Sequence, residues 1–112
     1  MRKRNIEDNL CTLNLLGKEI SAFIDTGNAL YYKDIPVILV NSSLIPMPEK
    51  PLIIPYSAIG KEGALLGFIP ENLSVTYMNK HLSPKCVVAL YNNEFHKNFD
   101  ALLHPDLLKE CI

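Results

Sequence analysis

Short apolar runs, some of them alternating with polar residues, recur along the chain and are separated by glycines and prolines. Residues 10–16 and 19–24 flank a turn at Gly17-Lys18, and residues 35–40 form a third run with Pro36 near its start. Alternation with period two, interrupted by turn residues, is typical of β-strands. The first two runs therefore predict a β-hairpin.

The second half repeats this pattern after a proline-rich connection over residues 41–51. Residues 52–59 and 64–69 flank a predicted turn at Gly60-Lys61-Glu62-Gly63, and further strands are predicted at residues 73–78, 85–91 and 101–103. Pro105 suits the first position of a terminal helix. The sequence thus predicts an all-β fold, a small closed barrel of about six strands with one C-terminal helix.

Length and charge restrict the function classes. A chain of 112 residues with a net charge of −1 fits one domain, assigned to residues 9–112, and gives no electrostatic basis for nucleic-acid binding. The basic group Arg2-Lys3-Arg4 lies in an N-terminal tail over residues 1–8, which is either solvated or the cytoplasmic flank of a membrane span. No apolar run reaches the roughly 18 residues that cross a bilayer, so the chain as given is expected to be soluble.

The three cysteines, Cys11, Cys86 and Cys111, are widely spaced and odd in number. This pattern argues against a disulfide framework and is typical of reduced intracellular thiols. No paired Cys or His spacing predicts a metal site, and no cofactor is expected. None of the cysteines has a neighbouring histidine that would suggest a thiol nucleophile.

The tripeptide Asp25-Thr26-Gly27 carries the clearest chemistry, because an apolar strand leads directly into a carboxylate. Gly27 is expected to permit a backbone path closed to other residues, and the Thr26 hydroxyl to hold the turn. Aspartic proteases build half of their active site in this way, with two such carboxylates sharing one proton around a water. The tripeptide is also common in ordinary turns, so the tripeptide alone leaves both interpretations open.

Taken with the later run Ala101-Leu102-Leu103 and the helix after it, this motif resembles the retroviral-type aspartic proteases. In that family an apolar run and a short helix support the catalytic turn, although His104 stands where a glycine is usual. A narrower resemblance, over about residues 10–108, is to the sporulation sigma-E factor-processing peptidases, and there the histidine fits. Four segments carry it: Asp25-Thr26-Gly27-Asn28-x-Leu30, Pro36-Val37, Ile54-Pro55-Tyr56-Ser57-x-Ile59-Gly60 and Leu102-Leu103-His104-Pro105.

The resemblance implies an aspartic endopeptidase. Because the chain has a single Asp-Thr-Gly, Asp25 of two copies would have to meet at a two-fold axis. Thr26 would then bond across the axis, Gly27 would offer backbone to the substrate, and Asn28 and Ala29 would touch the substrate main chain. Gly60, Lys61, Glu62 and Gly63 form a candidate flap, or an ordinary surface hairpin. Tyr56 and Ser57 are candidates to line the cleft, although burial in the barrel is the favoured expectation for both.

The resemblance also implies a biological setting. Members remove the N-terminal pro-segment of a sporulation sigma factor precursor, in response to a signalling protein, at the cytoplasmic face of the mother-cell membrane. There an N-terminal membrane region, absent from this chain, would precede the protease domain. Two alternatives stay open: a non-catalytic module that binds the precursor or a signalling partner, and a latent half-enzyme that is monomeric because little sequence after the helix is left for a dimer-forming strand.

Overall fold

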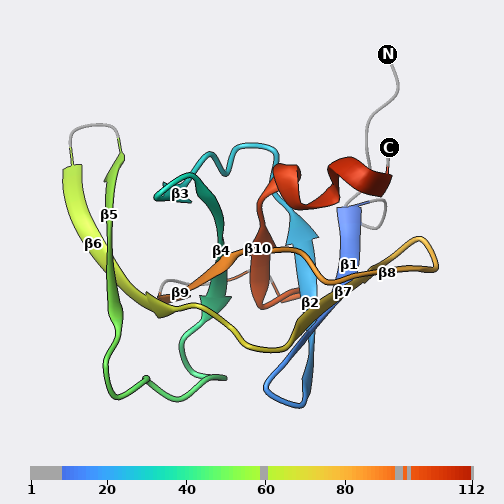
Figure 1. Cartoon of the computed structure of the whole chain (residues 1–112), viewed down its shortest axis with the longest axis horizontal. Helices are drawn as coiled ribbons and strands as arrows, with labels where there is room; N and C mark the ends of the chain where they lie inside the picture. Colours follow the sequence, from blue (N-terminus) through green and yellow to red (C-terminus); the bar gives the residue numbers. More distant parts are fainter. Residues whose placement is uncertain (1–8, 59–60, 93–94, 96, 112) are drawn as a thin grey trace.

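The computed structural model describes residues 9–58, 61–92, 95 and 97–111, and nearly all of the regular secondary structure in this part of the chain is β-strand (Figure 1). The sheet order is β5-β6-β9-β4-β10-β2-β1-β7-β8, with β3 paired to β4 beside this path. The elements are β1 (Leu10–Leu15), β2 (Lys18–Ile24), β3 (Tyr31–Tyr32), β4 (Ile35–Asn41), β5 (Leu52–Ala58), β6 (Lys61–Phe68), β7 (Leu73–Tyr77), β8 (Lys80–Leu82), β9 (Val87–Tyr91), β10 (Ala101–Leu103) and the 3₁₀-helix η2 (Pro105–Cys111).

Three hairpins close through two-residue loops in which both residues have positive φ. The loops are Leu16-Gly17 between β1 and β2, Lys33-Asp34 between β3 and β4, and Met78-Asn79 between β7 and β8. Positive φ at both loop residues matches the right-handed twist of paired strands. The turns therefore hold tight antiparallel pairs even where the first residue is Leu, Lys or Met.

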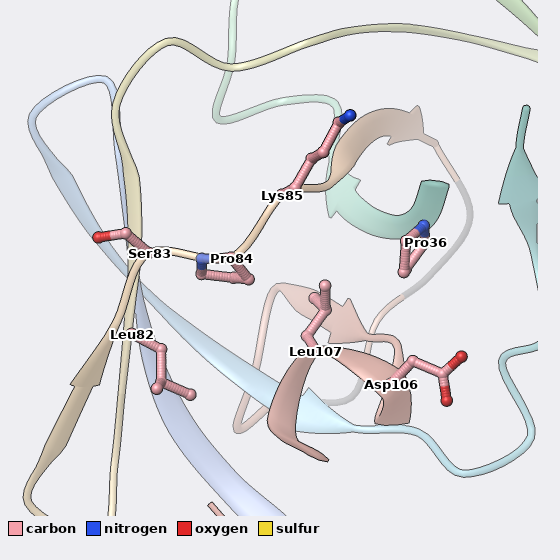
Figure 2. Close-up of a pocket in the computed structure, with 7 residues that line it drawn as sticks. All are labelled: Pro36, Leu82, Ser83, Pro84, Lys85, Asp106 and Leu107. Atoms are coloured by element: carbon pink, nitrogen blue, oxygen red, sulfur yellow. The ribbon is translucent and has the colours of Figure 1, made fainter. Parts of the chain in front are cut away.

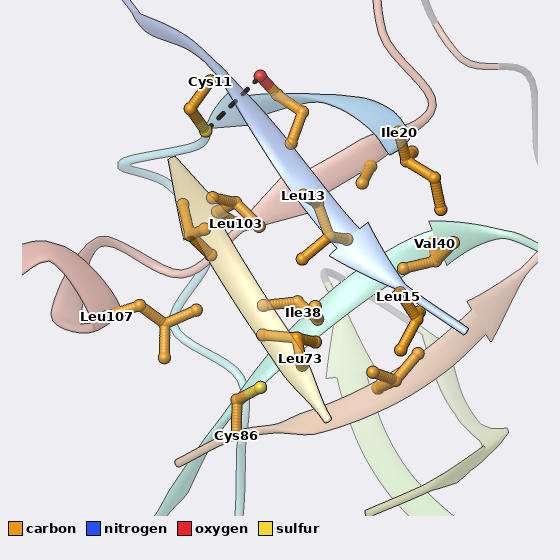
Figure 3. Packing of buried hydrophobic residues seen from close by; sticks show 14 of the residues in the cluster. Cys11, Leu13, Leu15, Ile20, Ile38, Val40, Leu73, Cys86, Leu103 and Leu107 are labelled. Atoms are coloured by element: carbon orange, nitrogen blue, oxygen red, sulfur yellow. Dashed lines mark hydrogen bonds between the residues drawn. The ribbon is translucent and has the colours of Figure 1, made fainter. Parts of the chain in front are cut away.

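The hydrophobic core lies on both faces of the sheet. In β4, Val37 and Ile38 are both fully buried, yet they belong to different clusters, because successive strand residues point to opposite faces. The larger cluster gathers inward side chains of β1, β2, β4, β7, β9 and β10 (Figure 3). The smaller one, Val37, Ile54, Val87 and Ala89, lies where β5 and β6 join β9. Strands β4 and β9 are thus buried on both sides.

The late apolar run supports the end of β2, as the resemblance implies. Strand β10 pairs in parallel with β2, from Ala101 opposite Ala22 to Leu103 opposite Ile24, and it also pairs with β4. The ladder continues one residue further, since the Asp25 amide donates to the Leu103 carbonyl at 3.1 Å. The position of Asp25 is therefore set by backbone hydrogen bonding to a strand almost eighty residues later in the chain.

The all-β prediction is confirmed, and the architecture is consistent with a retropepsin-like fold, but several details differ. The described sheet is open and has ten strands, because β5 and β6 stand out as a separate hairpin and β5 does not meet β8 (Figure 1). The residues after Met78, predicted as a turn, include strand β8, and the first hairpin turns at Leu16-Gly17 rather than at Gly17-Lys18. The terminal helix is a 3₁₀-helix.

Candidate active site

The turn that follows β2 presents the Asp25 carboxylate in a fixed orientation. Asp25 is half-buried, and its Oδ1 accepts a hydrogen bond from the Gly27 amide at 2.9 Å. The Asn28 amide donates to the Asp25 carbonyl oxygen at 2.9 Å and closes the turn. Three backbone amides, those of Asp25, Gly27 and Asn28, thus hold this single residue through their donated hydrogen bonds.

The expected reason for a glycine at position 27 is wrong. Gly27 does not have a left-handed φ; among the described glycines that conformation belongs to Gly17. A Cβ on Gly27 would instead lie 3.3 Å from Oδ1 of Asp25, which is closer than most contacts of a Cβ atom. The close approach of the carboxylate to the backbone thus means that a side chain at position 27 would have to displace Oδ1 of Asp25 by a few tenths of an ångström.

Asn28 anchors the other end of the turn. Its side chain is buried, Nδ2 donates to the Val37 carbonyl oxygen at 3.0 Å, and Oδ1 accepts from the Leu30 amide at 3.0 Å. The Val37 amide in turn donates to the Leu30 carbonyl at 3.0 Å. Both polar atoms of the Asn28 side chain are thus hydrogen-bonded to the backbone of the same chain, whereas the neighbouring Thr26, Gly27 and Ala29 are exposed.

Asp25 opens onto a cleft of about 410 Å³ between this turn and the β5–β6 hairpin. We call it the Asp25 cleft. It brings together Asp25, Gly27, Asn28 and Ala29 from the predicted site with side chains of β4, β5, β6 and β9; the added residues are Leu30, Leu39, Tyr56, Leu65 and Tyr91. Most of these are apolar or aromatic, so the carboxylate stands at the edge of a mainly apolar surface.

The hairpin contributes to the cleft differently from what the sequence predicted. Lys61, Glu62 and Gly63 belong to β6, where Gly63 pairs with Tyr56 of β5, and Gly60 lies outside the described residues. The predicted four-residue turn is therefore wrong in its position. Tyr56, expected in the barrel interior, is half-buried and lines the cleft. The motif that contains Tyr56 pointed to this segment, but the contact of its side chain with the cleft depends on strand pairing, which the sequence does not give.

A family model for a peptidase family, Peptidase_U4, sporulation factor SpoIIGA, matches residues 46–107, more than half of the chain. The chain belongs to this family. No curated protein matches the sequence. The family is a sporulation peptidase family, in agreement with the resemblance carried by the motifs.

The match to the sporulation peptidase family covers the β5–β6 hairpin and the supporting strand β10 but begins after the Asp25 turn. It therefore includes one wall of the Asp25 cleft, with Tyr56 and Leu65, as well as Leu39's strand neighbours in β9. Asp25 lies outside the matched residues, but its backbone N–H donates to the Leu103 carbonyl and its side chain lines the same cleft.

His104, part of the motif shared with this family, has a structural position. It is almost fully buried, and its Nδ1 accepts a hydrogen bond from the Asp106 amide at 3.0 Å. Its ring lies edge-on to Tyr31, with 4.6 Å between the ring centroids, and the Tyr31 hydroxyl donates to the Asp106 carboxylate. His104 thereby joins the start of η2 to β3, directly after the residue that holds the Asp25 amide.

Other chemistries find little support in the described part of the chain. It contains no group of three or more His, Cys, Asp or Glu residues placed to hold a metal ion. Burial raises the pKa of both the Cys11 and the Cys86 thiols to about 12, so neither is a nucleophile near neutral pH. Within the same ranges, no helix has the length and apolar character of a bilayer-spanning segment.

A second cleft, of about 390 Å³, contains none of the predicted site residues (Figure 2). Pro36, Pro84 and Leu107 contribute apolar surface, and Asp106 and Lys85 supply opposite charges from different elements. The Asp106 carboxylate already accepts the Tyr31 hydroxyl hydrogen bond. The Asp25 cleft is therefore the candidate active site.

Proposed function

We propose that this protein is an aspartic endopeptidase that acts as a homodimer and removes the N-terminal pro-segment of a sporulation sigma factor precursor. The proposal rests on one observation above all: Asp25 is the only carboxylate among the described residues that line the Asp25 cleft. Activation of water between two carboxylates requires a second one. With one copy per chain, a second protomer related by a two-fold axis is the simplest source.

In the proposed mechanism, one Asp25 carboxylate accepts a proton from a water molecule that attacks the scissile carbonyl carbon. The Asp25 of the other protomer is protonated, and it donates its proton to the carbonyl oxygen. The resulting tetrahedral intermediate collapses as its C–N bond breaks. The leaving amine takes the proton that the first Asp25 accepted from water, and a hydroxyl group of the intermediate returns a proton to the other Asp25. The two carboxyl groups titrate as a pair, so the pH dependence belongs to the dimer.

The neighbouring residues take supporting roles in this proposal. Thr26 is exposed beside Asp25, where its hydroxyl is available for a bond across the two-fold axis. Gly27 and Ala29, also exposed, offer main-chain groups to an extended peptide, and Asn28 keeps their segment attached to β4. The β5–β6 hairpin is the proposed flap, because it forms the wall of the cleft opposite the turn.

The family supports the proposed substrate and setting. A peptidase described as a sporulation factor acts on a protein, and a sigma factor precursor is the proposed substrate. The proposed location is the cytoplasmic face of the mother-cell membrane, reached through a membrane region outside this chain, with a signalling protein as activator. No cofactor takes part in the proposed reaction.

The test is cleavage of the purified precursor by this domain and by its Asp25→Asn variant, with the molar mass of both measured by size-exclusion chromatography and light scattering. Asp34→Asn is the matched control, because Asp34 is an exposed aspartate in the β3–β4 loop, where Asn tolerates the positive φ. We expect a dimer whose cleavage is abolished by Asp25→Asn and unchanged by Asp34→Asn.

A mixing experiment tests the shared site. Adding an excess of the Asp25→Asn protein should lower the activity of the wild-type protein, since mixed dimers contain one carboxylate of the required two. Cleavage by the Asp25→Asn variant would refute the aspartic mechanism. Cleavage by a monomer, at a specific rate independent of concentration, would refute the dimer. Binding of the precursor without cleavage by the wild-type domain would support the non-catalytic alternative.

A further inference from the structure

The Tyr56 ring packs directly over Gly63 on the neighbouring strand. The two residues are cross-strand partners, and a Cβ on Gly63 would lie 2.9 Å from Cε1, Cζ and the hydroxyl oxygen of Tyr56. Carbon atoms of real side chains do not approach other heavy atoms that closely, so the ring occupies space that any other residue at position 63 would fill. Cross-strand packing of an aromatic ring over glycine is a known way to fix a ring in a sheet.

The side of the hairpin on which this ring lies faces the Asp25 cleft. Tyr56 and Leu65 line the cleft, whereas Ile53, on the opposite face of β5, is 65% exposed. Because strand residues alternate between faces, Tyr56 shares its face with Ile54, which is buried in the smaller cluster. The hairpin thus directs one large aromatic side chain toward the carboxylate side of the molecule.

Gly63 therefore has an explanation other than flexibility. It lies inside β6 rather than in a turn, and its φ is not in the left-handed region. The contact that requires a glycine is the Tyr56 ring. A glycine retained for this reason positions Tyr56 and does not act as a hinge for the flap.

We propose that Tyr56, held in place over Gly63, is the side chain with which the β5–β6 hairpin grips the substrate peptide beside Asp25, and that it contacts an apolar side chain of that peptide. This inference rests on the proposed function and adds a substrate-contacting residue and its positioning residue. The ligand class follows from the lining: Leu30, Leu39 and Leu65 accompany two tyrosines, and Asp25 is the only charged group among the described lining residues. Such a surface favours an apolar or aromatic side chain.

The experiment measures binding separately from cleavage. The Asp25→Asn protein serves as the parent, and the dissociation constant of the intact, fluorescently labelled sigma factor precursor is measured by anisotropy. Tyr56→Ala, Gly63→Ala and the double variant are made in this parent, together with Tyr56→Phe, which keeps the ring. Ile53→Ala is the matched control on the opposite face of the same strand. Thermal melting checks that each variant is folded, and Tyr56→Leu replaces Tyr56→Ala if that variant is not.

We expect Tyr56→Ala to weaken binding by about tenfold, Tyr56→Phe by less than about threefold, and Ile53→Ala not at all. Gly63→Ala should also weaken binding by about tenfold, because its Cβ displaces the ring. The double variant should bind no more weakly than Tyr56→Ala alone, because the glycine acts only through the tyrosine. A merely structural role for Gly63 would instead make the two effects add.

Each contrary outcome overturns the inference. Unchanged affinity in Tyr56→Ala would show that the ring does not contact the substrate, and additive effects would show that Gly63 does not act through it. A parent that binds no precursor also overturns it. These failures are distinguishable from failure of the proposed function, which is decided by whether the wild-type domain cleaves the precursor and the Asp25→Asn variant does not.

Discussion

Replacing Asn28 tests whether its side chain holds the Asp25 turn in place. Asn28→Ala removes the donor to the Val37 carbonyl and the acceptor for the Leu30 amide, both at 3.0 Å. Asn28→Asp keeps the volume and the acceptor, but it brings a carboxylate oxygen against the Val37 carbonyl oxygen. The matched control is Asn72→Ala, since Asn72 is exposed in the connection before β7.

The magnitude follows from burial. Losing a hydrogen bond costs about 1 kcal/mol where water can replace it, as at half-buried Leu30, and about 1–3 kcal/mol where the remaining partner is buried, as at Val37. Asn28 is only 8% exposed, so water does not readily replace its amide group. We therefore expect Asn28→Ala to lower the free energy of unfolding by about 2–4 kcal/mol, and Asn28→Asp by at least as much. Asn72→Ala should stay within about 0.5 kcal/mol of wild type.

Urea unfolding followed by circular dichroism measures these differences, with the slope of free energy against urea compared among variants. Where the variants are still folded, precursor cleavage should also slow. The side chain of Asn28 holds its own backbone N–H in place, and that N–H donates to the Asp25 carbonyl oxygen at 2.9 Å within the same turn. An Asn28→Ala variant as stable as Asn72→Ala would refute the anchoring role. Equal stability loss with unimpaired cleavage would show that the turn keeps its geometry without the anchor.

Two further predictions concern stability. Gly67→Ala should lower the free energy of unfolding by about 3 kcal/mol, because its Cβ would lie 2.1 Å from the Val88 carbonyl oxygen, whereas Gly17→Ala, with open space but a φ of +75°, should lose about 1–2 kcal/mol. Urea unfolding compares the two, and a larger loss in Gly17→Ala would contradict the packing of β6 on β9. Burial raises the pKa of Cys11 and Cys86 from 9.0 to about 12, so as the pH rises the unfolded chain releases these protons before the folded chain does. The stability that the two neutral thiols contribute is therefore fully present below about pH 9 and should fall as the pH rises toward about 12. The Cys11→Ala/Cys86→Ala variant should lose less stability than wild type between about pH 8 and about pH 10.5, and equal losses would contradict the burial of the thiols.

Short apolar runs bounded by turn residues predicted most strands, and alternation supported those in which burial on one face imposes period two on the sequence. β1, with Cys11, Leu13 and Leu15 inward, shows this directly. β8 was missed because its hairpin turns at Met78-Asn79, and a methionine with positive φ gives no turn signal in a sequence. Tertiary pairing with β7 determines this conformation, which local preference alone does not.

The candidate site was predictable only in part. Asp25 could be found because a carboxylate directly after an apolar strand is a local feature, and its supporting strand β10 was found through the family resemblance. The Asn28 anchor depends on Val37, nine residues away, and the contact of Tyr56 with Gly63 depends on hairpin register. Sequence alone gives neither partner. It predicted that Asn28 contacts the substrate, which stays a prediction, and it favoured burial of Tyr56 in the barrel, whereas Tyr56 lines the cleft.

The glycines around the site show why these contacts could not be predicted from the sequence. From sequence, Gly27 and Gly63 both indicate turns or flexibility, yet neither has a left-handed φ. In each case the absent Cβ makes room for a side chain that lines the same cleft: the Asp25 carboxylate at Gly27 and the Tyr56 ring at Gly63. On each wall of the Asp25 cleft, a glycine thus leaves space for a neighbouring side chain. Adding a single methyl group at either glycine should disturb the site while the sheet stays folded, in contrast to Gly67, where the nearest atom is backbone.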